Sequence, residues 1–155
     1  MKRLLRRAAP IDWRVAGDVP ADVETGAVDM PVDVIVPVYR AAAELARCLA
    51  ALRRHTDLAP GAHRLVVVED GGRDAEVDAQ LAALEAETAV DAVVLRNDER
   101  RGFVASVNRG MRHSRRDVVL LNSDTEVTAG WLVKMRRAAY STPAAATVTP
   151  SATSN

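Results

Sequence analysis

Polar side chains with metal-binding potential follow a short apolar run near the end of the chain. In the stretch DVVLLNSDTEV, Asp117 to Val127, four apolar residues run directly into Asn122, Ser123 and Asp124. An apolar run of this length is typical of a buried strand, so the polar triplet is expected at the edge of a core. Carboxylate and amide oxygens there are the ligands that Mg²⁺ or Mn²⁺ prefers.

Three other apolar runs also end in polar residues or glycines. Parallel strands meet at one edge through their carboxyl ends, where ligands bind, so these groups are expected on a single rim. Besides the triplet, the rim would hold Pro37, Tyr39 and Arg40; Glu69, Asp70, Gly71 and Gly72; and Arg96, Asn97, Asp98, Glu99, Arg100, Arg101 and Gly102.

Such a rim has the parts needed to bind a nucleoside diphosphate. Tyr39 could stack on a base, and Asp70 could accept a hydrogen bond from a ring N–H. Arg100 or Arg101 could neutralise phosphate charge. Gly102 and the Gly71-Gly72 pair would let backbone approach a ligand closely.

Each of these residues also has a purely structural explanation. Asp70-Gly71 is a common turn pair, and Asp74 is a good N-cap for the helix that follows. Tyr39 could simply cover the edge of the core, and the segment RNDERRG is by itself a solvated charge run. The ligand-binding interpretation is favoured because several such residues converge on one rim.

Apolar periodicity predicts an α/β fold with a mostly parallel sheet and helices on both faces. Strands and helices alternate, and the strands are near-continuous Val/Leu runs, which indicates burial on both sides. The expected strands cover 32–38, 63–70, 91–97 and 117–122; the helices cover 41–56, 74–87, 102–114 and 130–140; and a fifth strand is possible within 144–150.

Composition limits the class of protein. The chain has 155 residues, with 21 Lys plus Arg and 21 Asp plus Glu, a balance that argues against nucleic-acid binding. The single cysteine, Cys48, excludes an internal disulfide framework and is expected to be a small core residue in a reducing, cytoplasmic protein. No apolar run approaches the roughly 20 residues of a membrane span.

The expected organisation is one central region with two flanks. Residues 1–31 are predicted to be an N-terminal arm or lead-in; its basic start MKRLLRR lacks a signal peptide's apolar stretch but could contact anionic lipid at the inner face of a membrane. Residues 32–150 would form the nucleotide-binding region, and 151–155 a tail. We expect the architecture to be truncated at Asn155.

Four blocks in this order resemble the family 2 glycosyltransferases of Rossmann-like GT-A fold. They are VDVIVPVYR, LVVVEDGGRD, NDERRGFVASVNRGM and DVVLLNSDTEVTAGWL, and the resemblance covers roughly residues 32–150. It implies transfer of a sugar, with inversion, from a nucleotide-diphosphate sugar to an acceptor hydroxyl on a glycan, a lipid-linked glycan or a protein, as in cell-envelope polysaccharide synthesis.

The resemblance also implies roles for individual residues. Asn122-Ser123-Asp124 matches the Asp-x-Asp motif that holds Mg²⁺ or Mn²⁺, with Asp124 and Asn122 as metal ligands. One residue of the acidic pair Glu69-Asp70 would contact the base. Ala105 would pack under the donor, and Trp131 and Leu132 behind the motif. The implied nucleotide-binding residues are Pro37, Tyr39, Glu69, Asp70, Arg101, Gly102, Asn108, Asn122 and Ser123.

Two departures from the family pattern affect these expectations. Asn122 replaces the first aspartate of the motif, so Asp124 would carry most of the coordination. The family's catalytic base and acceptor site lie in the half that follows the matching region, so no general base is assigned here. This chain would then be the donor-binding half of an enzyme, inactive when alone.

Other functions remain open at this point. A nucleotidyltransferase usually has a glycine-rich basic loop after the first strand, whereas PVYRAAAEL contains no glycine. A signalling receiver domain needs acidic residues where Pro37-Val38-Tyr39 lies. A non-catalytic binding module or remnant of the same fold is the stronger alternative, and an assay of sugar transfer or hydrolysis would separate it from the enzyme.

Overall fold

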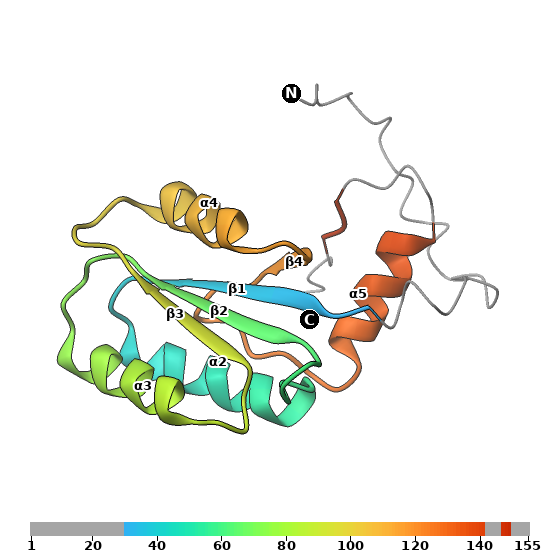
Figure 1. The fold of residues 1–155 in the computed structure, drawn as a ribbon, viewed down its shortest axis with the longest axis horizontal. Helices are drawn as coiled ribbons and strands as arrows, with labels where there is room; N and C mark the ends of the chain where they lie inside the picture. Colours follow the sequence, from blue (N-terminus) through green and yellow to red (C-terminus); the bar gives the residue numbers. More distant parts are fainter. Residues whose placement is uncertain (1–29, 142–146, 150–155) are drawn as a thin grey trace, which may run out of the picture. The chain divides into compact units, whose positions relative to one another are not determined.

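The computed structural model describes residues 30–141 and 147–149 and shows alternating strands and helices (Figure 1). The elements are β1 (Val32–Val38), α2 (Ala42–His55), β2 (Arg64–Glu69), α3 (Ala75–Ala86), β3 (Ala92–Arg96), α4 (Phe103–His113), β4 (Asp117–Leu120) and α5 (Trp131–Tyr140). The chain divides into two compact units. Residues 29–132 form one and contain the whole sheet, while α5 from Val133 onward belongs to the other.

The four strands form one parallel sheet in the order β3-β2-β1-β4. β1 is central: Val34 lies opposite Leu65 of β2 on one side and Val119 of β4 on the other. The chain therefore builds outward from β1 through β2 to β3, and then returns to place β4 on the far side of β1. This reversal is a topological switch point, where open α/β sheets bind ligands beyond the carboxyl ends of the strands.

Helices cover both faces of the sheet, which confirms the predicted α/β class. α2 and α3 lie on one face and α4 on the other (Figure 1). Alternate β1 residues Val34, Val36 and Val38 join the larger core under α2 and α3. Ile35 points the opposite way and packs with Val66 and Val68. All seven residues of β1 are buried, so a continuous apolar run, rather than strict alternation, encodes this strand.

α4 approaches the sheet very closely at one glycine. A Cβ built on Gly110 would lie 2.6 Å from Cγ2 of Ile35, and 3.3 Å from Cγ2 of Val68. No real side chain tolerates the first distance without a shift of its neighbour. Gly110 therefore sets the separation between α4 and the strands below it.

An ion cluster joins β1, β2 and the segment before β4 at the amino-terminal edge of the sheet. Asp33 is fully buried, and Arg64 donates to both of its oxygens, at 3.2 Å from Nε and 2.6 Å from Nη2. Arg116 approaches within 3.6 Å from the segment before β4. Burial alone would raise the pKa of Asp33, but hydrogen bonds from Arg64 and Ser114 and the two positive charges outweigh it, so the pKa lies below its ordinary 3.8.

Most predicted boundaries agree with the structure to within one residue, and the fourth strand is the exception. It was expected to reach Asn122 but ends at Leu120. The Leu121 N–H still donates to Ile35 O, and the chain then turns, with the Thr125 N–H donating to Asn122 O. The possible fifth strand falls largely outside the described residues, and its described part, 147–149, is not in a strand.

Two smaller expectations are confirmed. Asp74 caps α3 by accepting from the N–H groups of Glu76 and Val77. Cys48 is buried in the core under α2. Among the described residues, no helix combines the length and apolar character needed to cross a membrane.

Candidate functional site

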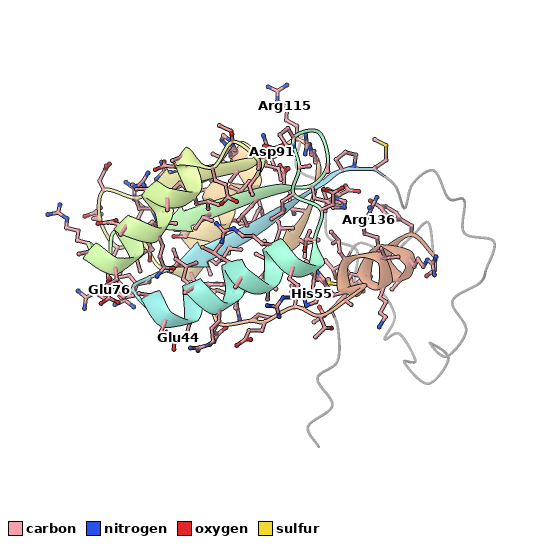
Figure 2. All side chains as sticks on the ribbon, turned by 90° about the horizontal axis from the view of Figure 1, so that it is seen from below. Glu44, His55, Glu76, Asp91, Arg115 and Arg136 are labelled. Atoms are coloured by element: carbon pink, nitrogen blue, oxygen red, sulfur yellow. The ribbon has the colours of Figure 1, made fainter. Side chains whose placement is uncertain are left out.

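A cleft of about 450 Å³ opens between the loops that follow β1 and β4, at the switch point of the sheet. We call it the switch-point cleft. The loop after β1 contributes Tyr39 and Ala41, and α2 contributes Glu44, which Figure 2 shows at the opposite end of that helix from His55. The complete lining is Pro37, Tyr39, Ala41, Glu44, Phe103, Asn122, Ser123 and Asp124.

The turn that carries Asn122 and Asp124 is held by a buried neighbour and by hydrogen bonds to the Asn122 carbonyl oxygen. The Leu121 side chain is buried, and the turn closes through a 3.1 Å hydrogen bond from the Thr125 N–H to Asn122 O. The thiol of Cys48 lies 3.8 Å from the same carbonyl oxygen. The side chains of Asn122 and Asp124 themselves are exposed. This turn thus presents one amide and one carboxylate to the cleft.

These two side chains suit a hard divalent cation that is also held by a ligand. Within the described part of the chain, no group of three or more His, Cys, Asp or Glu residues forms a complete metal cage. Mg²⁺ in phosphate-binding sites typically uses one or two carboxylates and completes its shell with water and phosphate oxygens. The donor set of Asn122 and Asp124 at an open cleft fits that mode of binding.

A second, smaller cleft of about 160 Å³ adjoins the first under the start of α4. We call it the α4 cleft. Pro37, Tyr39 and Phe103 line both clefts, so the two share one wall. The remaining lining residues of the α4 cleft are Val38, Asp70, Arg100, Gly102 and Ser106.

Two arginine side chains lie over the Tyr39 ring, which is predicted to stack on a base. Cζ of Arg100 lies 4.3 Å from the ring centroid, and Cζ of Arg40 lies 5.3 Å from it. Such distances are within the range of cation–π attraction. The ring therefore offers a surface for planar groups beside the α4 cleft, and Arg100 occupies part of it.

Asp70 sits almost completely buried at the end of β2, with four donors around its carboxylate. Oδ1 accepts from Asn97 Nδ2 at 2.8 Å, Ser106 Oγ at 2.9 Å and the Arg101 N–H at 2.8 Å, while Oδ2 accepts from the Gly102 N–H at 2.8 Å. Burial alone would raise the pKa of Asp70, but these hydrogen bonds, led by that of Arg101, outweigh it and hold the pKa below 3.8.

The other predicted site residues lie at varying distances from the clefts. Glu69 is buried and accepts from the Gly72 N–H, so it closes the turn after β2. The Arg101 side chain is exposed and, like Asn108 on the outer side of α4, lines neither cleft. Trp131 packs against the larger core and donates from Nε1 to Thr56 Oγ1 at 3.0 Å, and Leu132 is buried.

Ala41 and three larger residues that line the clefts were not predicted from the sequence. Ser106 is a buried polar residue on the inner face of α4, and that position among apolar residues was its only signal. Phe103 begins α4 with 57% of its surface exposed. Glu44 lies in the first turn of α2, and its position a few residues after β1 could have indicated that it is close to the rim.

A family model and several solved structures match the chain. The family model described as Glycosyl transferase family 2 matches residues 33–154. No curated protein matches the chain.

Several solved structures share the fold. Mannosyltransferase PcManGT from Pyrobaculum calidifontis, solved with GDP-Man and Mn²⁺, aligns with TM-score 0.61 and 24% identity over 68% of this chain and 31% of its own. GalNAc-T7, solved with UDP, GalNAc and Mn²⁺, aligns with TM-score 0.62 and 16% identity over 72% of this chain and 21% of its own. S. aureus TarS 1-349 aligns with TM-score 0.56 and 20% identity over 66% of this chain and 30% of its own. The chain thus spans less than a third of each.

Proposed function

Because the chain belongs to glycosyl transferase family 2, we propose that it binds the nucleotide-diphosphate sugar donor of a glycosyl transfer in its two adjoining clefts. The single observation that carries this proposal is the position of Asn122 and Asp124. They line the switch-point cleft together with Tyr39 and Ala41 of the loop after β1. Parallel α/β sheets bind ligands at such a place, and these are the side chains that a diphosphate-bound cation requires.

In this proposal the donor spans both clefts. The base lies in the α4 cleft against Tyr39, whose ring suits stacking. The diphosphate extends into the switch-point cleft, where Asn122 and Asp124 would hold Mg²⁺ or Mn²⁺ with it. When bound, that cation would supply Lewis-acid stabilisation of the charge that develops on the departing diphosphate.

Arginines near the clefts would complete the binding of the phosphates. Arg100 lines the α4 cleft, and its guanidinium can pair with phosphate oxygens in a bidentate manner. Arg101, one residue further along, is exposed and would act through its charge at longer range. Pro37, Gly102 and Ser123 would contribute backbone and small side-chain surface around the donor.

Transfer itself also requires a base that removes the proton of the acceptor hydroxyl. We assign that role to no residue of this chain, which covers 31% of the length of the mannosyltransferase. We therefore propose residues 32–150 as the donor-binding part of an inverting transferase. Sugar transfer by this chain alone would exclude the alternative that it is a non-catalytic binding module, whereas absence of transfer agrees with both.

Calorimetry with UDP, GDP and dTDP, each with and without Mn²⁺, tests the proposed function. We expect at least one nucleotide to bind, and Mn²⁺ to strengthen its binding. Asp124→Ala should weaken the Mn²⁺-dependent binding by about tenfold or more while the fold is retained, because the side chain is exposed.

The matched control is Glu126→Ala, which removes an exposed carboxylate two positions away that pairs with Arg47 and lines neither cleft. It should bind within about twofold of the unmodified protein. A folded protein that binds none of the nucleotides would refute the proposed function. Equal Mn²⁺-dependent affinity in Asp124→Ala would refute the metal role of that residue.

A further inference from the structure

The carboxylate of Asp70 is surrounded by donors from the segment that follows β3. Two of its four hydrogen bonds come from consecutive backbone N–H groups, those of Arg101 and Gly102. The other two come from Asn97 and Ser106, which flank the same loop. Three of the four donors converge on Oδ1 and one reaches Oδ2, so the protein engages both oxygens of the carboxylate.

The residues around Asp70 are themselves interlocked. Asn97 Nδ2 also donates to Ser106 Oγ at 2.9 Å, and Asn97 Oδ1 accepts from Arg109 Nη1 at 2.6 Å. The backbone of Asp70 is held as well, since its N–H donates to Val38 O at 2.9 Å. Asn97, Asp70 and Ser106 are all buried, so these bonds are shielded from competing water.

The loop that Asp70 holds carries much of the wall of the α4 cleft. Arg100 directly precedes the two bonded N–H groups and lies against the Tyr39 ring, while Gly102 and Phe103 line the cleft itself. The loop also rests on Gly71, which has φ +69°. A Cβ at Gly71 would collide with the backbone of Glu99 and Arg100. The position of the loop is therefore set jointly by the Asp70 carboxylate and by the missing side chain of Gly71.

We infer that Asp70 is a positioning residue, which shapes the base-binding cleft by anchoring the loop 97–102. This inference rests on the proposed donor binding and adds an anchoring role to the sequence-based expectation that Asp70 accepts a ring N–H. The carboxylate acts through Arg100, Gly102 and Phe103, which face the ligand.

A panel of bases separates the two roles. Uracil and guanine present a ring N–H, whereas cytosine and adenine present a ring nitrogen acceptor. Asp70→Asn keeps the size of the side chain but turns part of it into a donor. If Asp70 positions the loop, this change should weaken binding of all four nucleotides, UDP, GDP, CDP and ADP, by about tenfold. If Asp70 acts only by contacting a ring N–H, CDP and ADP should keep their affinity, and that result would overturn the inference.

Ser106→Ala provides a second variant that leaves the carboxylate intact. It removes one donor from the anchor, and the small change should be tolerated in the folded protein. We expect a common loss of about threefold for every nucleotide. Asp78→Asn, the same chemical change at an exposed position on α3, is the matched control and should change no affinity. Unaltered affinities in Ser106→Ala would count against the anchor.

Amide hydrogen exchange tests the anchor without any ligand. At least one of the Arg101 and Gly102 amides should exchange at least tenfold faster in Asp70→Asn than in the unmodified protein, because the variant side chain keeps one oxygen and presents an NH₂ group in place of the other. Equal exchange would overturn the inference, whatever the binding results. If the unmodified protein binds no nucleotide, the proposed function fails, and this exchange measurement still decides whether Asp70 holds the loop.

Discussion

At the scale of single residues, two buried aspartates show how position determines what a carboxylate does. Asp33 lies at the amino-terminal end of β1 and is neutralised by Arg64 and Arg116. Asp70 lies at the carboxyl-terminal end of β2 and is satisfied mainly by backbone N–H groups and small polar side chains. The first pairs charge with charge to join strands, and the second organises a loop beside a cleft.

The buried charge of Asp33 predicts a pH-dependent stability. Its pKa is lowered in the folded protein, so its contribution is present above about pH 3.8, its ordinary value, and is lost as pH falls through the folded-state pKa. Asp33→Asn should lower the free energy of unfolding at pH 7 by about 2 kcal/mol, because two arginines lose a buried partner. It should also flatten the acid limb of the stability curve.

Urea unfolding between pH 2.5 and pH 7 measures both effects. The acid limb should not vanish in the variant, because the pKa values of Asp70 and Glu85 are also lowered and contribute in the same range. Glu126→Gln, which alters a carboxylate with 59% of its side chain exposed, is the control and should differ little from the unmodified protein. An Asp33→Asn variant as stable as the control at pH 7 would contradict the assignment.

At the scale of elements, the strands and helices were predictable because each is encoded locally. The Val-rich run 32–38 gave β1 its bounds, and Leu45, Cys48, Leu49 and Leu52 gave α2 its buried face. The end of β4 was less predictable, because Leu121 continues the apolar run yet already leads into a turn.

The candidate site, too, could be predicted from the sequence only in part. The rim of polar residues could be predicted, since strand ends follow from strand positions. The engagement of Asp70 by Arg101 and Gly102 could not, because it joins groups more than thirty positions apart through tertiary structure alone.

The contact of α4 with the sheet gives a prediction at this scale. Glycine in a helix interior normally costs about 1 kcal/mol relative to alanine, so Gly110→Ala would stabilise an isolated α4. In the folded protein the added methyl meets Ile35, and we expect a net loss of about 1–3 kcal/mol in the free energy of unfolding.

Chemical denaturation measures this loss, and Arg112→Ala at an exposed position of α4 is the control. Because the clash is with one residue, the combined Gly110→Ala and Ile35→Ala variant should be less destabilised than the sum of its parts. A Gly110→Ala protein more stable than the unmodified one would show that α4 can move away from the sheet at little cost.

At the scale of the sheet-containing unit, stabilising charge and candidate site lie at opposite edges. Asp33 and Tyr39 are six residues apart along β1, which corresponds to about 20 Å of extended chain. Asp33 is moreover already paired with Arg64 and Arg116 at its own edge, so little of its charge should act on the site. The two ends of the sheet should therefore respond to mutation almost independently.

We expect substitution of Asp33 to affect mainly stability and substitution of Asp124 to affect mainly nucleotide binding. Asp33→Asn, kept at a temperature where it is folded, should bind its nucleotide within about twofold of the unmodified protein, whereas Asp124→Ala should unfold at nearly the same urea concentration as the unmodified protein but lose Mn²⁺-dependent binding. Calorimetry measures the nucleotide affinity of both variants, and urea unfolding measures their stability. Loss of binding in a folded Asp33→Asn protein would show that the edges are coupled.

The tight seat of loop 97–102 on Gly71 has a practical consequence for engineering. Two turns that belong to neighbouring strands interlock without room for a methyl group, so neither can be exchanged by itself. A chimaera meant to borrow donor preference from a relative would have to transplant both segments, 69–72 and 97–106, as one cassette.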